Sequence, residues 1–468
     1  MNVSSDSNNA WELTNACPLT LALSQGEREP EQARFDSKHS GAAAPSGSLS
    51  LRERAGVRGA FAVVREQIRH SASLLRSLTL VLTAFHHASA QSFLDSLDEA
   101  LSISNADQTL RADLSFLADL ELYVPETPAP GMIFSNEDAF VNPRLAVFLD
   151  IEATPYLQLH AQMRVDRGFD PGSVPDGDVR LDEYYLRLRP LGDDRLNIQV
   201  GKFATVFGNW VPRHLSWDNP FVTAPLPYED VLGMTDRSVP PTPTAFLNRQ
   251  NIPDKKADWL PLIWGPSYAS GASVSGRIDW FDYAVEIKNA SISSRPDAWD
   301  LGNVSLDHPT VTARLGARPS PEWAFGTSFS HGSYLLTEAN QSADQTTWGI
   351  DASYQHHHWQ LWGELMYSSF EVPNVGDAEC VFYYLEAKYK ITAQLFAALR
   401  WNQSFFGDVP NGLGGSAEWD RDAWRADLSL GWRISRHVQA KIQYSVGDKA
   451  GRDAEGDQLL ATQLTVRF

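Results

Sequence analysis

The sequence predicts an all-β protein, a transmembrane antiparallel β-barrel of about sixteen strands. Three observations predict it. Segments with period-two hydrophobicity recur through most of the chain, the connections between them alternate in length, and no run of about 18 apolar residues could form a membrane-spanning helix. Any membrane crossing must therefore use strands that close on themselves.

The segment 424–433 shows the alternation most clearly. Trp424, Ala426, Leu428, Leu430 and Trp432 alternate with Arg425, Asp427, Ser429, Gly431 and Arg433. Burying three charges in an apolar core would be costly, so the second face must meet water. The last segment, 458–468, has one largely apolar face and ends on Phe468.

Comparable segments recur upstream. They lie at 109–124, 140–153, 156–167, 180–189, 195–204, 267–278, 281–290, 309–318, 322–331, 346–356, 358–369, 381–390, 393–403 and 437–446. Short turns such as 153–155, 318–321 and 434–436 alternate with longer loops rich in Gly, Pro and Asp, which predicts one tight rim and one rim of long loops.

Composition excludes several classes of protein. The formal net charge of -19 argues against a nucleic-acid partner, because phosphate binding needs clustered Lys and Arg. Of the two cysteines, Cys17 and Cys380, only the second would remain in a processed chain, so no internal disulfide is expected. Sequence fingerprints of hydrolases, metalloproteases and nucleotide-binding enzymes are missing, and we predict neither enzyme activity nor a cofactor.

The first 108 residues divide into three parts. Residues 65–90 combine three arginines, a short apolar run and Ala88-Ser89-Ala90, which predicts a signal peptide cleaved after Ala90; an amphipathic helix is the alternative. Residues 1–64 are polar and unpatterned, and represent either a misassigned start or a disordered extension. Residues 91–108 would form a short periplasmic segment, helical or flexible, before the barrel at 109–468.

Pairs of Trp and Tyr stand near the ends of predicted strands, on the outward face. Trp and Tyr favour the membrane interface, where the ring is in apolar surroundings and the polar atom is wet. We therefore predict an aromatic girdle, against the alternative of ordinary buried aromatics. Its members are Trp348, Tyr354, Trp359, Tyr367, Tyr383, Tyr389, Trp424 and Trp432.

The connection 205–265 is far longer than the others and would be the third extracellular loop. A loop of this length needs a place to pack, and folding into the barrel lumen as a constriction would provide one. Its charges are nearly balanced, so they predict no clear ion selectivity. The candidate constriction residues are Arg213, Asp218, Glu229, Asp230, Asp236, Arg237, Arg249, Lys255 and Lys256.

Arginines recur at predicted inward positions of the wall. They are Arg111, Arg144, Arg164, Arg187, Arg189, Arg425 and Arg433. Those on the first strands could form a basic track that guides anions, or could pair with acids such as Asp113 and Asp166 in a wall of mixed charge. His356-His357-His358 falls at a predicted turn, where neighbouring side chains diverge, so we predict no metal site.

The early segment SLDEALSISNADQTLRADL (96–114), the stretch VGKFATVFG (200–208) and the terminal Phe468 resemble Gram-negative outer-membrane porins, loosely the phosphate-selective porin O and P family. The resemblance implies a third-loop constriction, a homotrimer, and recognition of Phe468 by the barrel-insertion machinery. The long loop lacks the dense Lys and Arg of that family, so phosphate specificity is not carried over.

These features together predict an outer-membrane porin through which small hydrophilic solutes or ions diffuse passively, with outer-membrane lipid as its surroundings. Two other classes remain open. An outer-membrane barrel enzyme of the lipase or protease type would need catalytic side chains at one rim, and an adhesive or structural barrel would need no open path.

Overall fold

The computed structural model describes residue 96 and residues 100–107, 109–126, 131–132, 138–167, 177–251, 258–297, 305–336, 342–449 and 458–468. The predicted extension at 1–64 and signal peptide at 65–90 lie outside these ranges, as does the cleavage site at Ala90. Within them, no helix has the length and apolar character needed to span a membrane.

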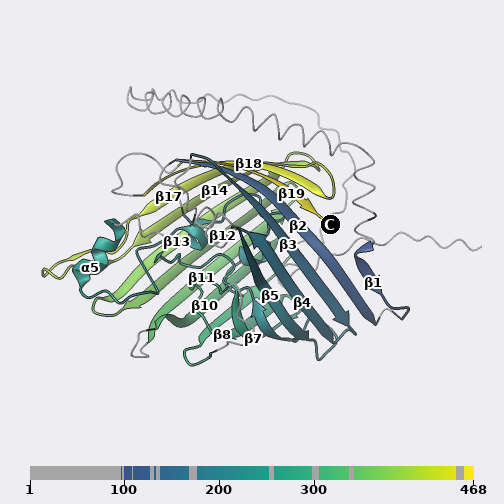
Figure 1. The fold of residues 1–468 in the computed structure, drawn as a ribbon, viewed down its shortest axis with the longest axis horizontal. Helices are drawn as coiled ribbons and strands as arrows, with labels where there is room; N and C mark the ends of the chain where they lie inside the picture. The colour runs from purple at the N-terminus through teal and green to yellow at the C-terminus, as the bar shows by residue number, and fades with distance from the viewer. Residues whose placement is uncertain are drawn as a thin grey trace, which may run out of the picture. The chain divides into compact units, whose positions relative to one another are not determined.

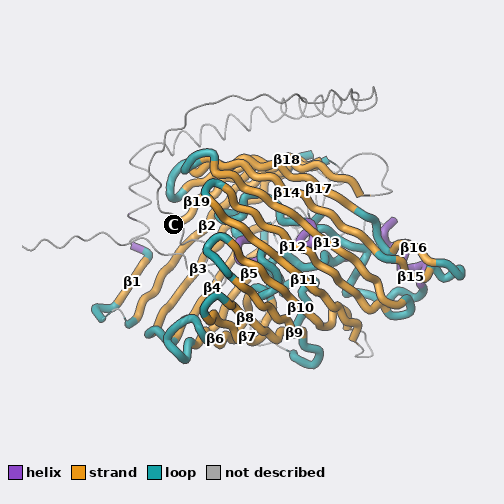
Figure 2. The backbone as a smooth tube through the Cα atoms, turned by 180° about the vertical axis from the view of Figure 1, so that it is seen from behind, coloured by secondary structure: helices purple, strands orange, loops and turns teal. Residues whose placement is uncertain are grey.

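Sixteen strands form one closed antiparallel barrel (Figures 1 and 2). They are β2 (Leu110–Pro125), β3 (Phe140–Ala153), β4 (Leu157–Asp166), β5 (Asp178–Leu188), β6 (Asn197–Phe203), β7 (Ala269–Ile278), β8 (Phe281–Lys288), β9 (Thr310–Ala317), β10 (Trp323–Leu336), β11 (Ser342–His356), β12 (Trp359–Val372), β13 (Gly376–Lys390), β14 (Leu395–Phe406), β17 (Ala423–Arg433), β18 (Val438–Lys449) and β19 (Gln458–Arg467). Each pairs with the next along the chain, and β19 pairs with β2 to close the sheet.

The predicted barrel and its strand number are confirmed. β3 has the predicted bounds, whereas β11 and β13 begin about four or five residues earlier than predicted. Their added residues, such as those at 342–345, are polar or small on both faces, so the period-two signal was lost there. The sequence analysis also missed β1 (Ser102–Ser104), which pairs with the start of β2, and the hairpin of β15 (Asp408–Pro410) and β16 (Ser416–Glu418).

The two rims differ as the loop lengths predicted. Turns at 154–156, 279–280, 357–358 and 434–437 connect strands at one rim, which we call the short-turn rim. His357 adopts a left-handed conformation in its turn, with φ of 50°. The C-terminus and β1 lie on the opposite side of the barrel from α5 (Pro243–Leu247), a helix of the long loop (Figure 1).

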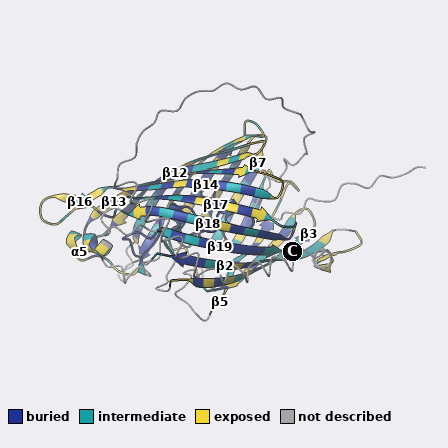
Figure 3. Cartoon of the chain, turned by 90° about the horizontal axis from the view of Figure 1, so that it is seen from above, coloured by how far each residue is buried: buried dark blue, intermediate teal, exposed yellow. Residues whose placement is uncertain are grey.

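The two faces of the wall differ in chemistry. On β17, Leu428 and Leu430 are 58% and 45% exposed, while Arg425, Asp427 and Ser429 are buried. Burial alternates in the same way along other strands (Figure 3). In a closed sheet the buried face is the inner one, so the outer face is apolar and the inner face carries most of the charge.

Placing a charge on the outer face should destabilise the barrel. Leu428→Arg should lower the free energy of unfolding by about 2 to 4 kcal/mol, because the guanidinium would replace an apolar group in contact with lipid. Urea unfolding in lipid vesicles measures this. Leu413→Arg is the matched control, because Leu413 is 87% exposed in the tip between β15 and β16 and should change stability little. Equal losses for both variants would contradict the assignment of the outer face.

Candidate functional site: the long loop and the inner wall

The connection between β6 and β7, residues 204–268, contacts the inner wall along much of its length. It begins by passing three strands in turn. The backbone N–H of Ala204 donates to Glu183 of β5, Thr205 Oγ1 donates to Glu286 of β8 at 2.7 Å, and the N–H of Gly208 donates to Ser328 of β10 at 3.1 Å. The loop therefore follows the wall rather than leaving the barrel after β6.

Glu364 of β12 accepts several hydrogen bonds from the loop. The Tyr228 hydroxyl donates to its carboxylate at 2.6 Å, and the backbone N–H groups of Asn209 and Trp210 also donate to it. Gly208 stands beside this cluster with φ of 75°, and a Cβ there would lie 2.5 Å from the Tyr228 hydroxyl oxygen. Only glycine fits, because a side chain would meet both a strained backbone and the Glu364 carboxylate.

Arg213 connects the loop to β13. Its guanidinium pairs with Glu386, donates to the Tyr384 hydroxyl at 3.2 Å, and lies over the Trp362 ring at 4.5 Å. Because all three partners belong to neighbouring wall strands, the side chain fixes the position of the short 3-10 helix Val211–Arg213.

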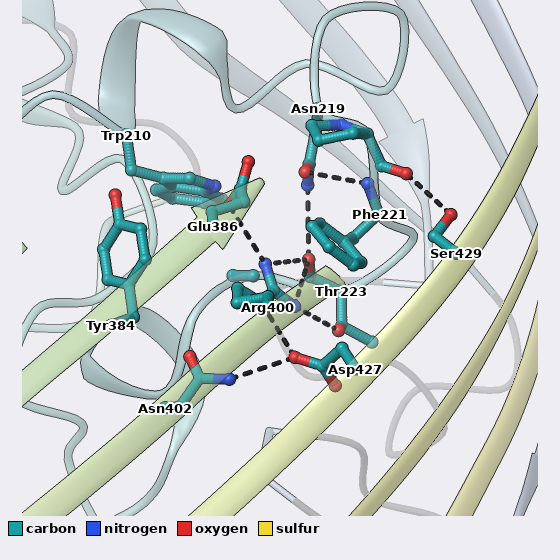
Figure 4. A network of polar contacts seen from close by, with 12 residues as sticks. Trp210, Asn219, Phe221, Thr223, Tyr384, Glu386, Arg400, Asn402, Asp427 and Ser429 are labelled. Atoms are coloured by element: carbon teal, nitrogen blue, oxygen red, sulfur yellow. Dashed lines mark hydrogen bonds and ion pairs between the residues drawn. The ribbon is translucent and has the colours of Figure 1, made fainter. Parts of the chain in front are cut away.

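Arg400 of β14 is fully buried and connects the wall to the next part of the loop (Figure 4). It donates to Asp427 of β17 at 2.8 Å, and to the carbonyl and hydroxyl oxygens of Thr223 at 3.2 and 3.0 Å. The Phe221 ring lies 4.2 Å from its guanidinium carbon. A charge with no access to water is tolerated only with such a full set of partners.

β18 holds the same part of the loop from another direction. The Lys441 ammonium donates to the carbonyl oxygens of Ser216, Asn219 and Phe221 at 2.6, 2.8 and 3.0 Å. The Gln443 side chain accepts from the backbone N–H of Thr223 at 3.1 Å. Residues 216–223 are thus fixed by hydrogen bonds to their backbone, which depend little on which side chains they carry.

Apolar residues of the long loop form a core with apolar residues of the inner wall. Loop residues such as Tyr228 and Leu262 pack with Phe370, Phe382 and Phe406, which are inner-face residues of β12, β13 and β14. The loop therefore covers both a polar part of the inner wall, which it contacts through hydrogen bonds, and this apolar part. This core includes the short helix α4 (Leu226–Glu229), whose first three residues are buried.

The predicted constriction residues have different surroundings. Arg213 is buried, Glu229 pairs with Arg425, and Asp230 lies 3.6 Å from Lys449. Arg237 pairs with Asp258 in an exposed contact at the loop's outer part. Asp218 is exposed, Asp236 and Arg249 are half-buried, and Lys255 and Lys256 lie outside the described residues.

Most of the predicted wall arginines have defined partners. Arg111 pairs with Asp113 at 2.7 Å, Arg144 with Asp119 and Glu121, and Arg164 with Asp182 at 2.8 Å. Arg187 and Arg189 donate to Gln158, Arg425 pairs with Asp427, and Arg433 donates to Gln439. Asp166 pairs with Arg180 instead of a predicted arginine. On the first strands these pairs favour the mixed-charge wall over a continuous basic track.

The predicted girdle residues all lie on the outer face. Trp348, Trp359, Tyr367, Tyr389 and Trp432 are exposed, while Tyr354, Tyr383 and Trp424 are partly exposed. Several form ring contacts between strands, such as Trp359 with Tyr389 and Trp401 with Trp424. The structure gives no lipid boundary, so their role as a girdle stays a prediction.

His214, near the beginning of the long loop, contacts Tyr268 at the end of the loop. Its Nδ1 donates to the Val211 carbonyl at 2.6 Å, and its Nε2 accepts from the Tyr268 hydroxyl at 2.8 Å. Burial and the nearby Arg164 guanidinium lower the pKa of His214 to about 3. The imidazole is therefore neutral at physiological pH, so Nδ1–H donates to the Val211 carbonyl and Nε2 is free to accept from the Tyr268 hydroxyl.

A pocket opens against the inner face of β5 to β8, beside the start of the loop. Arg187, Gln199, Ser273 and Asp282 are among its lining residues. Across the described residues there is no cluster of three or more His, Cys, Asp or Glu side chains placed to hold a metal ion.

The wall residues that contact the loop were not predicted from the sequence. Glu364, Glu386, Arg400 and Asn402 stood at inward positions of predicted strands, but their contacts join positions more than 130 residues apart. A polar residue at such a position indicates only that the face is hydrated. Phe382 lay in a predicted strand, whereas Phe370 and Phe406 lay beyond the predicted ends of theirs, so the apolar part of the wall was not signalled either.

No family profile and no curated protein sequence matches the chain. Solved structures do match its fold. The outer membrane channel DcaP of Acinetobacter baumannii is 12% identical, with a TM-score of 0.51 over 78% of this chain and 99% of that one. The trimer form of OmpT of Vibrio cholerae is 10% identical, with a TM-score of 0.50 over 77% of this chain and all of that one. At such low identities the likeness establishes the fold alone.

The chain thus has the sixteen-stranded barrel of Gram-negative outer-membrane porin structures. OmpF of Salmonella typhi, solved with daunomycin, is also similar, with a TM-score of 0.49 and 13% identity over 78% of this chain and all of that one. The comparisons do not support the resemblance to phosphate-selective porins in particular.

Removing Arg400 should cost far more than removing a surface cation. Arg400→Ala should lower the free energy of unfolding by about 3 to 5 kcal/mol, because the buried Asp427 would lose one of its two arginine partners and the buried Thr223 carbonyl would lose its donor. Arg237→Ala, which breaks the exposed pair with Asp258, should cost less than about 1 kcal/mol. Urea unfolding and protease sensitivity of residues 213–229 would measure both effects. Similar values for the two variants would show that the buried network does not hold the loop.

Proposed function

We propose that this protein is an outer-membrane porin, a passive diffusion channel for small hydrophilic solutes or ions. The observation that carries the proposal is a closed sixteen-stranded wall whose outer face is apolar and whose inner face is charged. Such a wall is suited to lipid outside and water inside, and a barrel of this size is too wide for its own side chains to fill.

The long loop is the proposed constriction of the channel. Its support is the series of hydrogen bonds from residues 204–229 to β5, β8, β10, β12, β13, β14, β17 and β18. A segment held at so many points can narrow the path without closing and opening like a lid. A pocket beside β5 to β8, lined by Arg187, Gln199 and Asp282 and by loop residues 204–206, lies next to this segment.

The proposed orientation places the short-turn rim in the periplasm and the long loops outside the cell. This follows the usual arrangement of outer-membrane barrels. The proposal includes export by a signal peptide at 65–90, and insertion of the barrel aided by the terminal Phe468. In the structure, the backbone N–H of Phe116 donates to the Phe468 carbonyl and the two rings lie 5.3 Å apart, which fixes the terminal residue against β2.

A barrel enzyme and an adhesive barrel have less support. A hydrolase would need a nucleophile, a base and an orienting group together at one rim. The strongest buried carboxylate cluster, around Glu364, instead accepts structural hydrogen bonds from the loop. An adhesive barrel would not need a charged inner wall.

Planar-bilayer recording tests the channel proposal. The processed protein, residues 91–468, should give stable steps of current that rise linearly with voltage, because the path is filled with water and has no gate. Addition of the same detergent without protein is the control. A folded, inserted barrel that gave no conductance would refute the proposal, and hydrolytic activity in its place would favour the enzyme.

Trp217 provides a test of the constriction. Its ring packs with Leu117 of β2 and Ala146 of β3, so the loop reaches the wall on that side as well. Trp217→Ala should increase single-channel conductance, because it removes a large side chain from the proposed path. Trp280→Ala is the matched control, since Trp280 is 50% exposed in the turn between β7 and β8. Equal conductance for both variants and the unmodified protein would argue against the constriction.

We further propose a homotrimer assembled through the face of β2 to β6. Exposed aromatic side chains are unevenly distributed around the barrel. Between Ile278 and Trp432 they include Trp280, Trp323, Trp348, Trp359, Trp401 and Trp432, whereas the exposed large hydrophobics on β2 to β6 are aliphatic. Tyr156, in the turn between β3 and β4, is an exposed aromatic on this side. A face whose strands expose aliphatic rather than aromatic side chains is better suited to another subunit than to a lipid boundary.

The native mass of the detergent-solubilised protein tests the assembly. It should equal three chains, and cysteines introduced at Leu120 or Leu145, which are 44% and 38% exposed on this face, should cross-link between chains. A cysteine at Leu399, 56% exposed on β14, is the control and should not cross-link. The mass of a single chain would refute the trimer while leaving the channel proposal intact.

A further inference from the structure

The pocket against the inner face of β5 to β8 extends from the start of the long loop toward the short-turn rim. Glu183, Phe203 and residues 204–206 line it beside the loop, and Asp194 and Arg277 line its other end. Arg277 is the last residue but one of β7, just before the turn at 279–280, and Asp194 lies in the connection between β5 and β6. The backbone N–H of Arg277 donates to the Asp194 carbonyl at 2.9 Å, so the two residues are neighbours.

The Arg277 guanidinium has unused hydrogen-bonding capacity. Arg277 is half-buried, and its Nε is shielded from solvent without a hydrogen-bond acceptor. Within the described ranges, its side chain takes part in no hydrogen bond or ion pair. Asp282 stands opposite Arg277 in the β7–β8 ladder, but its carboxylate lies 3.4 Å from Arg318 Nε instead. Because a guanidinium presents its N–H donors in a fork that matches a carboxylate, Arg277 is able to bind one that enters the pocket.

Asp194 supplies the opposite charge at the same end of the pocket. It is exposed, and its carboxylate has no cationic partner in the part of the chain that the structure describes. The neighbouring Arg195 pairs with Asp193 at 2.8 Å and is therefore not available to it. The Asp194 carbonyl accepts from the Asn197 side chain at 3.3 Å as well as from Arg277, which fixes the backbone of the turn. The fold thus holds an unpaired carboxylate beside an unpaired guanidinium.

The other charged residues that line the pocket already have polar partners. The Glu183 carboxylate lies 3.5 Å from His160 Nε2 and accepts from the backbone of the loop. The Arg187 guanidinium donates to the side chains of Gln158 and Gln199 at 3.1 and 2.8 Å. Asp282 is occupied by Arg318, as described above. A solute in the pocket would therefore meet its strongest unsatisfied groups at Arg277 and Asp194.

Small side chains form the wall next to these two groups. Ser273 and Ser275 of β7 and Ala284 of β8 line the pocket, and strand register places Ser275 opposite Ala284. At the loop end, the Tyr185 and Phe203 rings meet edge to face, with centroids 6.4 Å apart. The small residues leave room for a compact solute beside Arg277, and the rings bound the space on the side of the loop.

We infer that this pocket is a binding subsite for small zwitterions, in which Arg277 binds the carboxylate of the solute and Asp194 binds its ammonium group. The inference names a solute class for the proposed channel and rests on that proposed function. A simple anion would be attracted by Arg277 and repelled by Asp194, whereas a zwitterion gains from both contacts. The argument depends on two adjacent groups and not on the net charge of the lumen.

The test is uptake of labelled solutes by lipid vesicles that contain the processed protein. Alanine is compared with lactamide, its uncharged isomer of nearly the same size. Alanine should enter faster by about fivefold, since one contact between opposite charges at roughly 4 Å in water raises occupancy by about that factor. The ratio of the two rates should be larger in about 0.1 M than in about 1 M KCl, because the Debye length falls from about 10 to about 3 Å.

Two variants separate the two halves of the subsite. Arg277→Gln and Asp194→Asn should each lower the alanine-to-lactamide ratio severalfold. Labelled lactate, which has the carboxylate without the ammonium group, should enter faster in Asp194→Asn, where alanine enters more slowly. Asp279→Asn is the matched control, because Asp279 is an exposed acid of the next turn at the same rim and does not line the pocket. Asn also tolerates the left-handed backbone of Asp279, with φ of 53°.

The outcomes distinguish failure of the subsite from failure of the channel. Equal uptake of alanine and lactamide by the unmodified protein would overturn the inference and leave the channel proposal standing. Faster entry of both lactate and alanine in Asp194→Asn would also overturn it, in favour of a site for anions. No uptake of either isomer by the folded, inserted protein would instead refute the channel itself.

Discussion

Closure of the sheet between β19 and β2 is the constraint on which the rest of this structure depends. An open sheet in a membrane would expose a row of unpaired N–H and C=O groups, and each would cost several kcal/mol in hydrocarbon. Once the ladder from Leu459 to Arg467 pairs with β2, every strand has two neighbours. Because side chains alternate along each strand, closure places the apolar side chains outside and the charged side chains inside.

The interior created by closure is too wide to be filled by the side chains of the wall, and the long loop packs against its inner face. Its contacts with the wall are of two kinds. Fully buried charges such as Arg400 and Asp427 fix its position through directed hydrogen bonds, whereas Phe370 and Phe382 bury apolar surface against it. Buried charges add little stability over an apolar core of the same volume, but their hydrogen bonds have a defined direction.

Pairing determines which charges of the inner wall are neutralised locally. Arg213 and Arg425 are neutralised by Glu386 and Glu229, so they act as parts of the scaffold. Lys388 instead lies against the Phe396 ring, and Arg433 donates to the side-chain oxygen of Gln439.

By itself, the sequence determined the strands, their number, the two rims and the outward face of each strand, because a strand between lipid and water must alternate with period two, as Leu428 and Asp427 do. It indicated that residues 205–265 need somewhere to pack. Only the tertiary structure decided which wall residues receive the loop and which cations stay without a carboxylate. Contacts such as Thr223 with Arg400 join distant positions, and a period-two pattern records which face a residue is on but not what lies opposite it.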